Sequence, residues 1–231
     1  MGQMSNWGEI RSLPYERAIE EYKRLIQESE RSGEYVAIRL VRELALHDLF
    51  FLLVYVLGVD VANNEWVYNR CRDVEQETNN YIDLWPREHF KSTIITIAHK
   101  IQLVLNNPNI TICIMSFTRS IAKGFLREIK HHFEMNERLK QLYPDILWND
   151  PRSESPRWND DTGLIVKRTK IRKEATIEAW GVIDGQPTSK HYDYIEYDDV
   201  ITADLVRTPE MRRKVMETIA LSFNLGSRNF K

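Results

Sequence analysis

The sequence has only two cysteines, Cys71 and Cys113, among its 231 residues. They lie far apart and belong to no Cys/His pattern with metal-ligand spacing, which argues against a zinc site and favours a reducing, intracellular setting. The longest apolar run, Leu49 to Val59, spans eleven residues, whereas a membrane-spanning helix needs about 18 or more. The N-terminus carries no apolar signal region. We therefore expect a cytoplasmic protein with a core helix at this run and no membrane anchor.

A strong excess of charge of either sign is also missing. The chain has 32 Lys plus Arg and 34 Asp plus Glu, a formal net charge of −2, so it has no overall positive field to hold a polyanion. The exception is local, because Lys167 to Lys173 places five cations in seven residues. This stretch could contact a phosphodiester backbone, although such a charge run is more often the solvated face of a hairpin.

The length predicts one large domain or two small ones. In residues 1–60, an amphipathic stripe after Pro14 predicts a helix ending near Gly33, and a second helix is expected from Glu34 to Leu57. Residues 61–231 alternate strands with helices, which predicts an α/β fold with a mainly parallel sheet covered by helices on both faces. Strands are expected at 81–85, 110–115, 163–166, 176–180 and 194–198, helices at 92–105, 119–135 and from 208 onward, and a surface loop at 148–161.

The segment from Trp85 to Thr93 lies between a predicted strand and a predicted helix, where a phosphate-binding loop belongs. In such a loop a lysine, here Lys91, faces the β and γ phosphates, and the following Ser92 hydroxyl completes the shell of a magnesium ion. The pattern GxxxxGK[ST] requires glycine at Trp85 and Phe90, because glycine permits unusual backbone torsions and close approach of phosphate. The segment matches this loop in position and chemistry but not in its glycines.

A second candidate is the pair of carboxylates, Asp198 and Asp199, at the end of the apolar strand that begins at Tyr194. In phosphoryl-transfer sites one such carboxylate holds magnesium and a neighbour orients or deprotonates the attacking water. Turn formation and solvation are the ordinary explanation of two aspartates at a strand end. However, the loop and the acidic pair both follow predicted strands, and open α/β sheets bind ligands at that edge.

Together these motifs resemble the ATPase domain of the large terminase subunit, the DNA-packaging motor of tailed double-stranded DNA phages. The similarity covers about Tyr81 to Phe223. The phosphate loop of that family has the form P-R-G-x-x-K-S-T, often with a small or apolar residue before the lysine, where this chain has Phe90. Glu88 replaces the usual glycine. The positions that match the form are Pro86, Arg87, His89, Lys91, Ser92 and Thr93.

The resemblance implies a RecA-like P-loop NTPase core that binds ATP with Mg2+. By this resemblance Lys91 binds the β and γ phosphates, while Ser92 and Asp198 hold the metal ion. Arg87 would act as a sensor that reaches the γ phosphate from the same chain, where a planar guanidinium fork suits the geometry. The nucleotide-binding residues would be Pro86, Arg87, Glu88, His89, Phe90, Lys91, Ser92 and Thr93.

The identity of the catalytic carboxylate is open between two residues. Many family members have Asp-Glu where this chain has Asp198-Asp199, so Asp199 is the first candidate. Glu196 is the second, because it points to the same strand face as Asp198. Family members often place an arginine before this strand that reaches a neighbouring subunit, and here Lys190 and His191 occupy that stretch.

The resemblance also implies the partners and the setting of the protein. These are double-stranded DNA, a portal protein and a small terminase subunit, with a homo-oligomeric ring docked on the procapsid in the host cytoplasm and a monomer in isolation. The family's coupling strand and nuclease domain would follow Lys231, so we expect a fragment. A helicase-like remodelling ATPase and a non-hydrolysing assembly module are the alternatives. Adenine could stack on Trp66, Tyr68 or Tyr81, for which core packing is the ordinary role.

Overall fold

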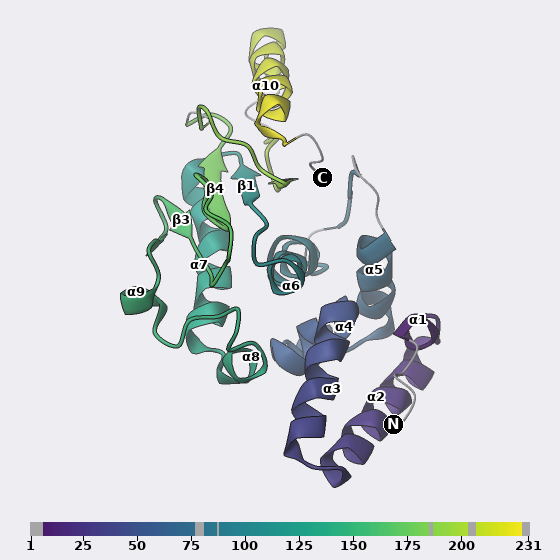
Figure 1. Ribbon diagram of the computed structural model, residues 1–231. Coiled ribbons are helices and arrows are strands. Elements are labelled where there is room, and N and C mark those ends of the chain that lie inside the picture. Colours follow the sequence, from purple (N-terminus) through teal and green to yellow (C-terminus); the bar gives the residue numbers. More distant parts are fainter. Residues whose placement is uncertain (1–6, 77–80, 87, 185–186, 203–206, 228–231) are drawn as a thin grey trace.

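The computed structural model describes residues 7–76, 81–86, 88–184, 187–202 and 207–227. Its first part is a group of packed helices (Figure 1). The expected helix after Pro14 is confirmed and ends close to Gly33. The elements are α1 (Trp7–Arg11), α2 (Tyr15–Arg31), α3 (Glu34–His47), α4 (Leu49–Phe51), the π-helix η1 (Leu52–Val56), the 3-10 helix η2 (Asp60–Ala62) and α5 (Glu65–Gln76).

The single helix expected from Glu34 to Leu57 is instead divided at Asp48. The backbone of Asp48 is extended, with φ −140° and ψ 103°, and its carboxylate accepts a 2.9 Å hydrogen bond from the amide of Phe51 at the start of α4. The same carboxylate pairs with Arg72 of α5 at 2.7 Å, and both side chains are buried. A capping interaction and a buried ion pair therefore fix a break that hydrophobic periodicity does not reveal.

The second part of the chain adds further helices and a five-stranded sheet. The helix α7 has the bounds expected from its apolar stripe, and a short helix and strand lie within the expected loop at 148–161. The elements are the π-helix η3 (Ser92–His99), α6 (Lys100–Asn106), β1 (Ile112–Ser116), α7 (Arg119–Met135), α8 (Glu137–Leu142), α9 (Pro151–Glu154), β2 (Trp158–Asn159), β3 (Gly163–Leu164), β4 (Ile177–Gly181), β5 (Tyr194–Tyr197), α10 (Pro209–Ser222) and the 3-10 helix η5 (Phe223–Leu225).

The strands of the sheet follow the order β2-β3-β4-β1-β5. The strands β4, β1 and β5 are parallel, with Ile114 opposite both Ala179 and Glu196. The short strands β2 and β3 pair antiparallel beside them. The α/β class is therefore confirmed, whereas the sheet is mixed and parallel only in its longer strands.

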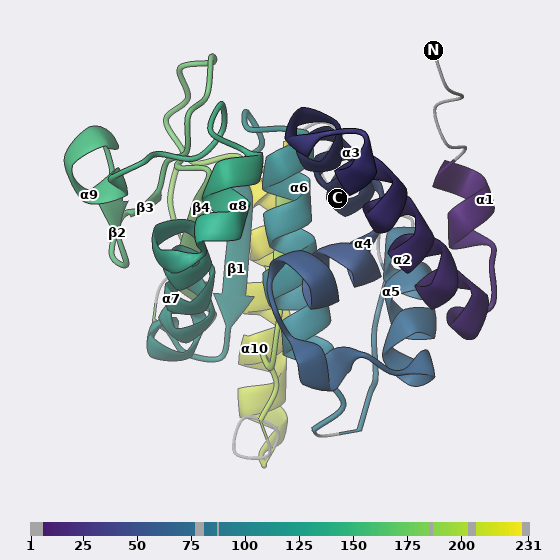
Figure 2. The same cartoon turned by 90° about the horizontal axis from the view of Figure 1, so that it is seen from below.

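Both faces of β1 are buried. Ile112 and Ile114 belong to the larger core, which also contains residues of the N-terminal helices and of α7. Cys113 and Met115, on the opposite face, belong to a smaller core with Leu225 of η5. In Figure 2, β1 lies between α7 and α6, with α10 behind it. The strand is thus enclosed, which explains its uninterrupted apolar sequence.

The strand expected at 81–85 is wrong. Residues 81–86 form no strand, and Ile82 and Leu84 are 80% and 91% exposed. Strand propensity depends largely on packing against neighbouring strands, and in the described chain this segment has no such neighbour. Just before β5, Tyr192 instead pairs with Gly226 in an isolated parallel β-bridge.

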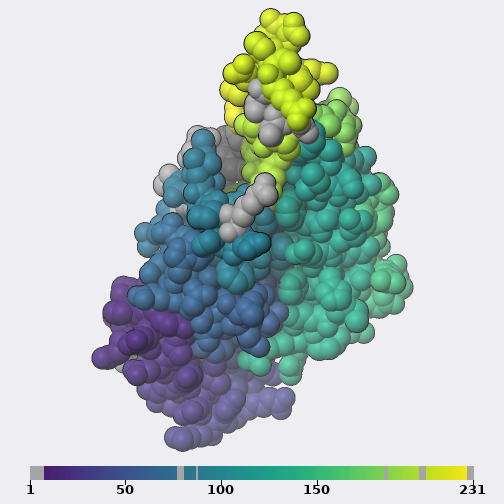
Figure 3. Space-filling model, turned by 180° about the vertical axis from the view of Figure 1, so that it is seen from behind, coloured from purple at the N-terminus to yellow at the C-terminus, as the bar shows by residue number. Residues whose placement is uncertain are grey.

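The C-terminal helix α10 stands out from the body of the molecule (Figure 3). Thr208 caps it through a 3.2 Å hydrogen bond to the amide of Met211, and Pro209 occupies its first turn, as the sequence predicts. Within the described ranges, no helix is both long enough and apolar enough to cross a bilayer.

Gly181 permits a close approach that fixes α7 against the sheet. A Cβ atom added at Gly181 would lie 2.4 Å from the amide nitrogen of Arg119 and 2.9 Å from the carbonyl carbon of Thr118. We expect Gly181→Ala to lower the free energy of unfolding by about 1–3 kcal/mol, because backbone would have to shift. Gly124→Ala, within α7 and with open space around it, should instead stabilise by about 0.5–1 kcal/mol. Urea denaturation of both variants checks this, and equal effects would contradict it.

Candidate active site

The loop before η3 has the backbone of a glycine-rich loop without its glycines. Glu88 and Phe90 both lie in the left-handed region, with φ 64° and φ 60°. Glu88 stands at the glycine of the P-R-G form, and Phe90 at the second glycine of GxxxxGK[ST]. Side chains thus occupy two positions whose torsions favour glycine. The loop therefore lacks the glycines of the motif, but at these two positions it has the positive φ that glycine favours.

Three side chains from the start of η3 converge on the carboxylate of Asp198, the residue after β5. The ammonium of Lys91 donates to Oδ1, while the hydroxyls of Ser92 and Thr96 each donate to Oδ2 at 2.7 Å. Asp198 is almost fully buried. Burial would raise its pKa, but the three hydrogen bonds outweigh that effect and hold the pKa below its ordinary value. The group is therefore a buried, ionised carboxylate.

Lys91 lies between the two adjacent aspartates. Besides its contact with Asp198, its Nζ is 3.6 Å from Oδ1 of Asp199. Partial burial would lower the pKa of Lys91, but the hydrogen bond to Asp198 and the charges of both carboxylates raise it. The ammonium is thus held at the loop, at the carboxyl end of β5.

A polar ladder extends from this point along the helix. Ser92, Thr96 and Lys100 recur every four residues, and they meet carboxylates that recur every two residues on β5. Residues four apart lie near one helix face, and residues two apart lie on one strand face. Sequence reasoning found Ser92 but missed Thr96 and Lys100. Their spacing in an otherwise apolar helix was the available signal.

Glu196 forms the far end of this ladder. Its Oε2 lies 2.9 Å from Nζ of the fully buried Lys100, whose ammonium also lies 4.1 Å from the centroid of the Tyr194 ring. Burial would lower the pKa of Lys100, but the charge of Glu196 raises it. Asp199, by contrast, is exposed and has φ 49°. The two candidates for the catalytic carboxylate therefore differ sharply, because only Glu196 is committed to a buried cation.

The other sequence-predicted loop residues have the following places. Pro86 is exposed, and the ring of His89 packs edge-on against Trp66 of α5 at 5.3 Å between centroids. Phe90 packs against the larger core, and Thr93 is half-buried in η3. Arg87 lies outside the described residues.

Of the three aromatic candidates for adenine stacking, only Trp66 lies at the loop. It contacts both His89 and Trp85, each at 5.3 Å between centroids. Tyr68 is buried and donates a 2.8 Å hydrogen bond to the carbonyl of Leu13, so it is part of the core. Tyr81 is exposed.

Lys190 is engaged within its own chain. Its ammonium binds the buried carboxylate of Glu178 and lies 5.2 Å from the ring of Trp180. The amide of the next residue, His191, donates to Glu174 at 2.9 Å.

Compared with known proteins, the chain matches no family model and no curated protein. In the part of the chain that the structure describes, no three His, Cys, Asp or Glu side chains are grouped as a metal centre. A magnesium ion bound with a nucleotide needs only one or two protein carboxylates, with phosphates and water completing its shell. Ser92 and Asp198 together are such a minimal donor set.

The left-handed torsions of the loop give a stability prediction. At Glu88 we expect the glycine variant to be more stable than the alanine variant by about 1 kcal/mol, because a Cβ atom is unfavourable at positive φ. At His89, outside the set of positive-φ residues, alanine should be the more stable. Both variants at a position lose the contacts of the native side chain, so their difference in stability reports mainly the backbone preference. Thermal unfolding of the four variants measures the two differences, and the same order at both positions would disprove the strain.

The buried pair predicts a strong coupling between helix and strand. Lys100→Met should cost about 3–5 kcal/mol, because it leaves the carboxylate of Glu196 without its cation. Adding Glu196→Gln should restore much of that loss. A double-mutant cycle on unfolding free energies measures the coupling, and strictly additive effects would show that the pair is not an ion pair.

Proposed function

We propose that this chain is an ATP-hydrolysing motor domain that powers movement of viral double-stranded DNA into a procapsid. The observation that carries the proposal is the convergence of Lys91, Ser92 and Thr96 on the buried Asp198 at the carboxyl end of β5. This arrangement joins a phosphate-binding lysine to a metal-binding carboxylate. The left-handed backbone at Glu88 and Phe90 supports the assignment of the loop.

The donor set suits ATP with Mg2+. Ser92 and Asp198 offer hard oxygen ligands on one side, and their oxygens already lie within hydrogen-bonding distance of each other. Lys91 offers a cation on the other side. The depressed pKa of Asp198 means that the metal ligand is ionised at neutral pH without help from the metal.

The chain's own residues would then act as follows. Lys91 leaves Asp198 to bind the β and γ phosphates, and Ser92 and Asp198 hold magnesium. Thr96 continues to donate to Asp198 and fixes the orientation of the carboxylate. Bound magnesium supplies charge neutralisation at the phosphate oxygens. Asp198 would then face the charge of the metal ion instead of the Lys91 ammonium, and Lys91 would neutralise phosphate charge.

Asp199 is the residue that best fits the role of general base. It lies beside Lys91, and its exposed carboxylate is open to a water molecule. Glu196 already neutralises the buried Lys100, so accepting a proton would leave that cation unpaired. The structure therefore favours Asp199 on energetic grounds.

The DNA-packaging part of the proposal is supported by the terminase resemblance of residues 81–223. It brings with it double-stranded DNA, a portal protein and a small terminase subunit as partners, and assembly into a ring. Because Lys190 is held by Glu178, we infer that any cation acting in trans comes from elsewhere in the chain.

The carboxylate roles can be separated by mutation. We expect Lys91→Ala to weaken ATP binding at least tenfold, and Asp198→Asn to remove most of the magnesium dependence of binding. Asp199→Asn should retain binding but lose hydrolysis, because its role belongs to the transition state. Calorimetric titration with and without magnesium and a steady-state ATPase assay are the measurements. Unchanged binding by a folded Lys91→Ala protein would refute the phosphate loop.

Glu196→Gln is the matched control for the Asp199 variant. It should destabilise the fold while any remaining folded protein still hydrolyses ATP. If Glu196→Gln abolishes turnover in folded protein and Asp199→Asn does not, then Glu196 is the base. Wild-type protein that fails to bind ATP would instead indicate the non-hydrolysing assembly module.

A further inference from the structure

A hollow of about 350 Å³ lies beside the basic loop 167–173, which we define by residues Lys167 to Lys173. Four cations line the hollow, no carboxylate does, and the ring of Trp148 forms part of its wall. In a chain with a net charge of −2, such a segregation of positive charge marks a site for an anion. The lining residues are Trp148, Pro156, Ile165, Val166, Lys167, Arg168, Thr169, Lys170, Ile171 and Arg172.

Most of the positive charge in the basic loop is not neutralised by acids. Lys167 donates to the carbonyl of Pro144 at 2.9 Å, and Lys173 to the carbonyl of Ser189 at 2.6 Å. Hydrogen bonds to neutral carbonyls position these cations without neutralising them, although the charge of Lys167 also acts on the Asp145 carboxylate. Arg172 is the exception, because it pairs with Asp193 at 2.8 Å.

Arg168 supplies an unsatisfied donor at the hollow. One of its guanidinium nitrogens bonds to the carbonyl of Arg172 at 3.1 Å, whereas Nη1 is buried and has no hydrogen-bond partner among the described residues. Burial and then the charges of Arg172 and Arg157 lower the pKa of Arg168, an effect that the charges of Glu174 and Glu178 only partly offset. A buried donor without a hydrogen-bond partner is unfavourable, and a small shift of the guanidinium toward the hollow would let an anion satisfy it.

The basic loop is also held in a fixed shape. Oδ1 of Asn109 accepts hydrogen bonds from the amides of Thr169 and Lys170 at 3.1 and 2.8 Å. At the tip, the side chain of Ile171 is fully exposed. In the described chain the ammonium of Lys170 next to it forms no ion pair. The loop therefore presents an apolar tip flanked by cations on a rigid base.

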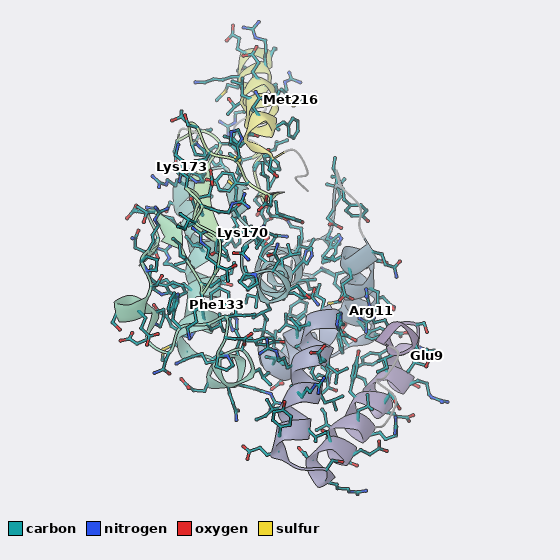
Figure 4. The ribbon with its side chains drawn as sticks, viewed as in Figure 1. Glu9, Arg11, Phe133, Lys170, Lys173 and Met216 are labelled. Atoms are coloured by element: carbon teal, nitrogen blue, oxygen red, sulfur yellow. The ribbon has the colours of Figure 1, made fainter. Side chains whose placement is uncertain are left out.

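The basic loop lies away from the nucleotide site. Asn109 precedes β1 and Asp198 follows β5, and these strands are parallel, so the loop and Asp198 lie at opposite ends of the strands. The five residues of β1 alone span roughly 16.5 Å at about 3.3 Å each, so the two lie at least that far apart along the strands. Figure 4 labels Lys170 and Lys173 near β4, far from Glu9 and Arg11 of the N-terminal helices.

We propose that the basic loop and its hollow bind the backbone of double-stranded DNA, with a phosphate at the hollow and Ile171 against the sugar and base edges of a groove. Cations held by neutral partners suit the regular phosphates of a duplex. An exposed isoleucine between them resembles the apolar wedges that groove-binding proteins insert. A single isoleucine offers too little apolar area for a membrane. That the polyanion is DNA rests on the proposed function, whereas the site itself rests on the contacts above.

Two variants with different salt signatures test the proposal in the full chain. Lys170→Ala should reduce the slope of log affinity against log salt by about 0.9, because one phosphate contact is lost. Ile171→Ser should weaken binding several-fold by the same factor at every salt concentration, because its contact is apolar. Fluorescence anisotropy with a short labelled duplex measures both effects. Lys23→Ala and Val61→Ser, which remove an exposed cation and an exposed apolar side chain on the N-terminal helices, are the matched controls and should change nothing.

Polyglutamate and single-stranded DNA test whether the loop binds a polyanion other than duplex DNA. Equal binding of polyglutamate, tighter binding of single-stranded DNA than of duplex, or loop variants that behave like the controls would each overturn the proposal. ATP binding is measured on the same proteins. It should be unaffected by the loop variants, and Lys91→Ala should leave DNA binding intact. If the loop variants weaken DNA binding as expected but the protein does not bind ATP, the proposed function is refuted. If the protein binds ATP but the loop variants leave DNA binding unchanged, this site is refuted.

Discussion

The register between the helix after the phosphate loop and the strand β5 is the constraint on which the molecule depends. The π-helix η3 and the first residue of α6 pair polar groups with the strand at two levels. Ser92 and Thr96 meet Asp198, and Lys100 meets Glu196. A shift of the helix by one residue would leave the buried Asp198 and the partly buried Glu196 without their partners.

A second buried network organises the helical part in a similar way. The carboxylate of Asp48 is shared by Arg72 at 2.7 Å and by the hydroxyl of Tyr22, and Arg72 also contacts Glu75 at 3.0 Å. Burial and the charge of Asp48 raise the pKa of Tyr22, so the phenol stays protonated and donates. Buried ion pairs add little net stability, but removing one partner is costly. Both networks therefore act mainly by selecting one arrangement of helices and strands.

Local patterns in the sequence predict the elements that depend on local physics. The apolar stripe of α7 gives its bounds, and the Thr208-Pro209 pair gives the start of α10. The break at Asp48 depends on Arg72, which lies 24 residues away, and periodicity within one helix does not record it. The expected strand at 81–85 fails for the same reason, because a strand needs a neighbour. In the site, motif spacing finds Lys91 and Asp198, whereas the four-residue spacing of Lys100 marks it as polar but does not reveal its partner Glu196.

The strand β1 connects the two candidate sites through direct hydrogen bonds. Just before it, Asn109 holds the basic loop, and near its end the carbonyl of Met115 accepts the amide of Asp198 at 2.9 Å. A contiguous path does not create coupling unless some element on it has two arrangements. Under the proposed function, the contact between Lys91 and Asp198 would be that element, because Lys91 would leave Asp198 to bind a phosphate. If the proposed nucleotide binding occurs, it would change the forces on the end of β5 and on Met115, and β1 would join that change to the basic loop.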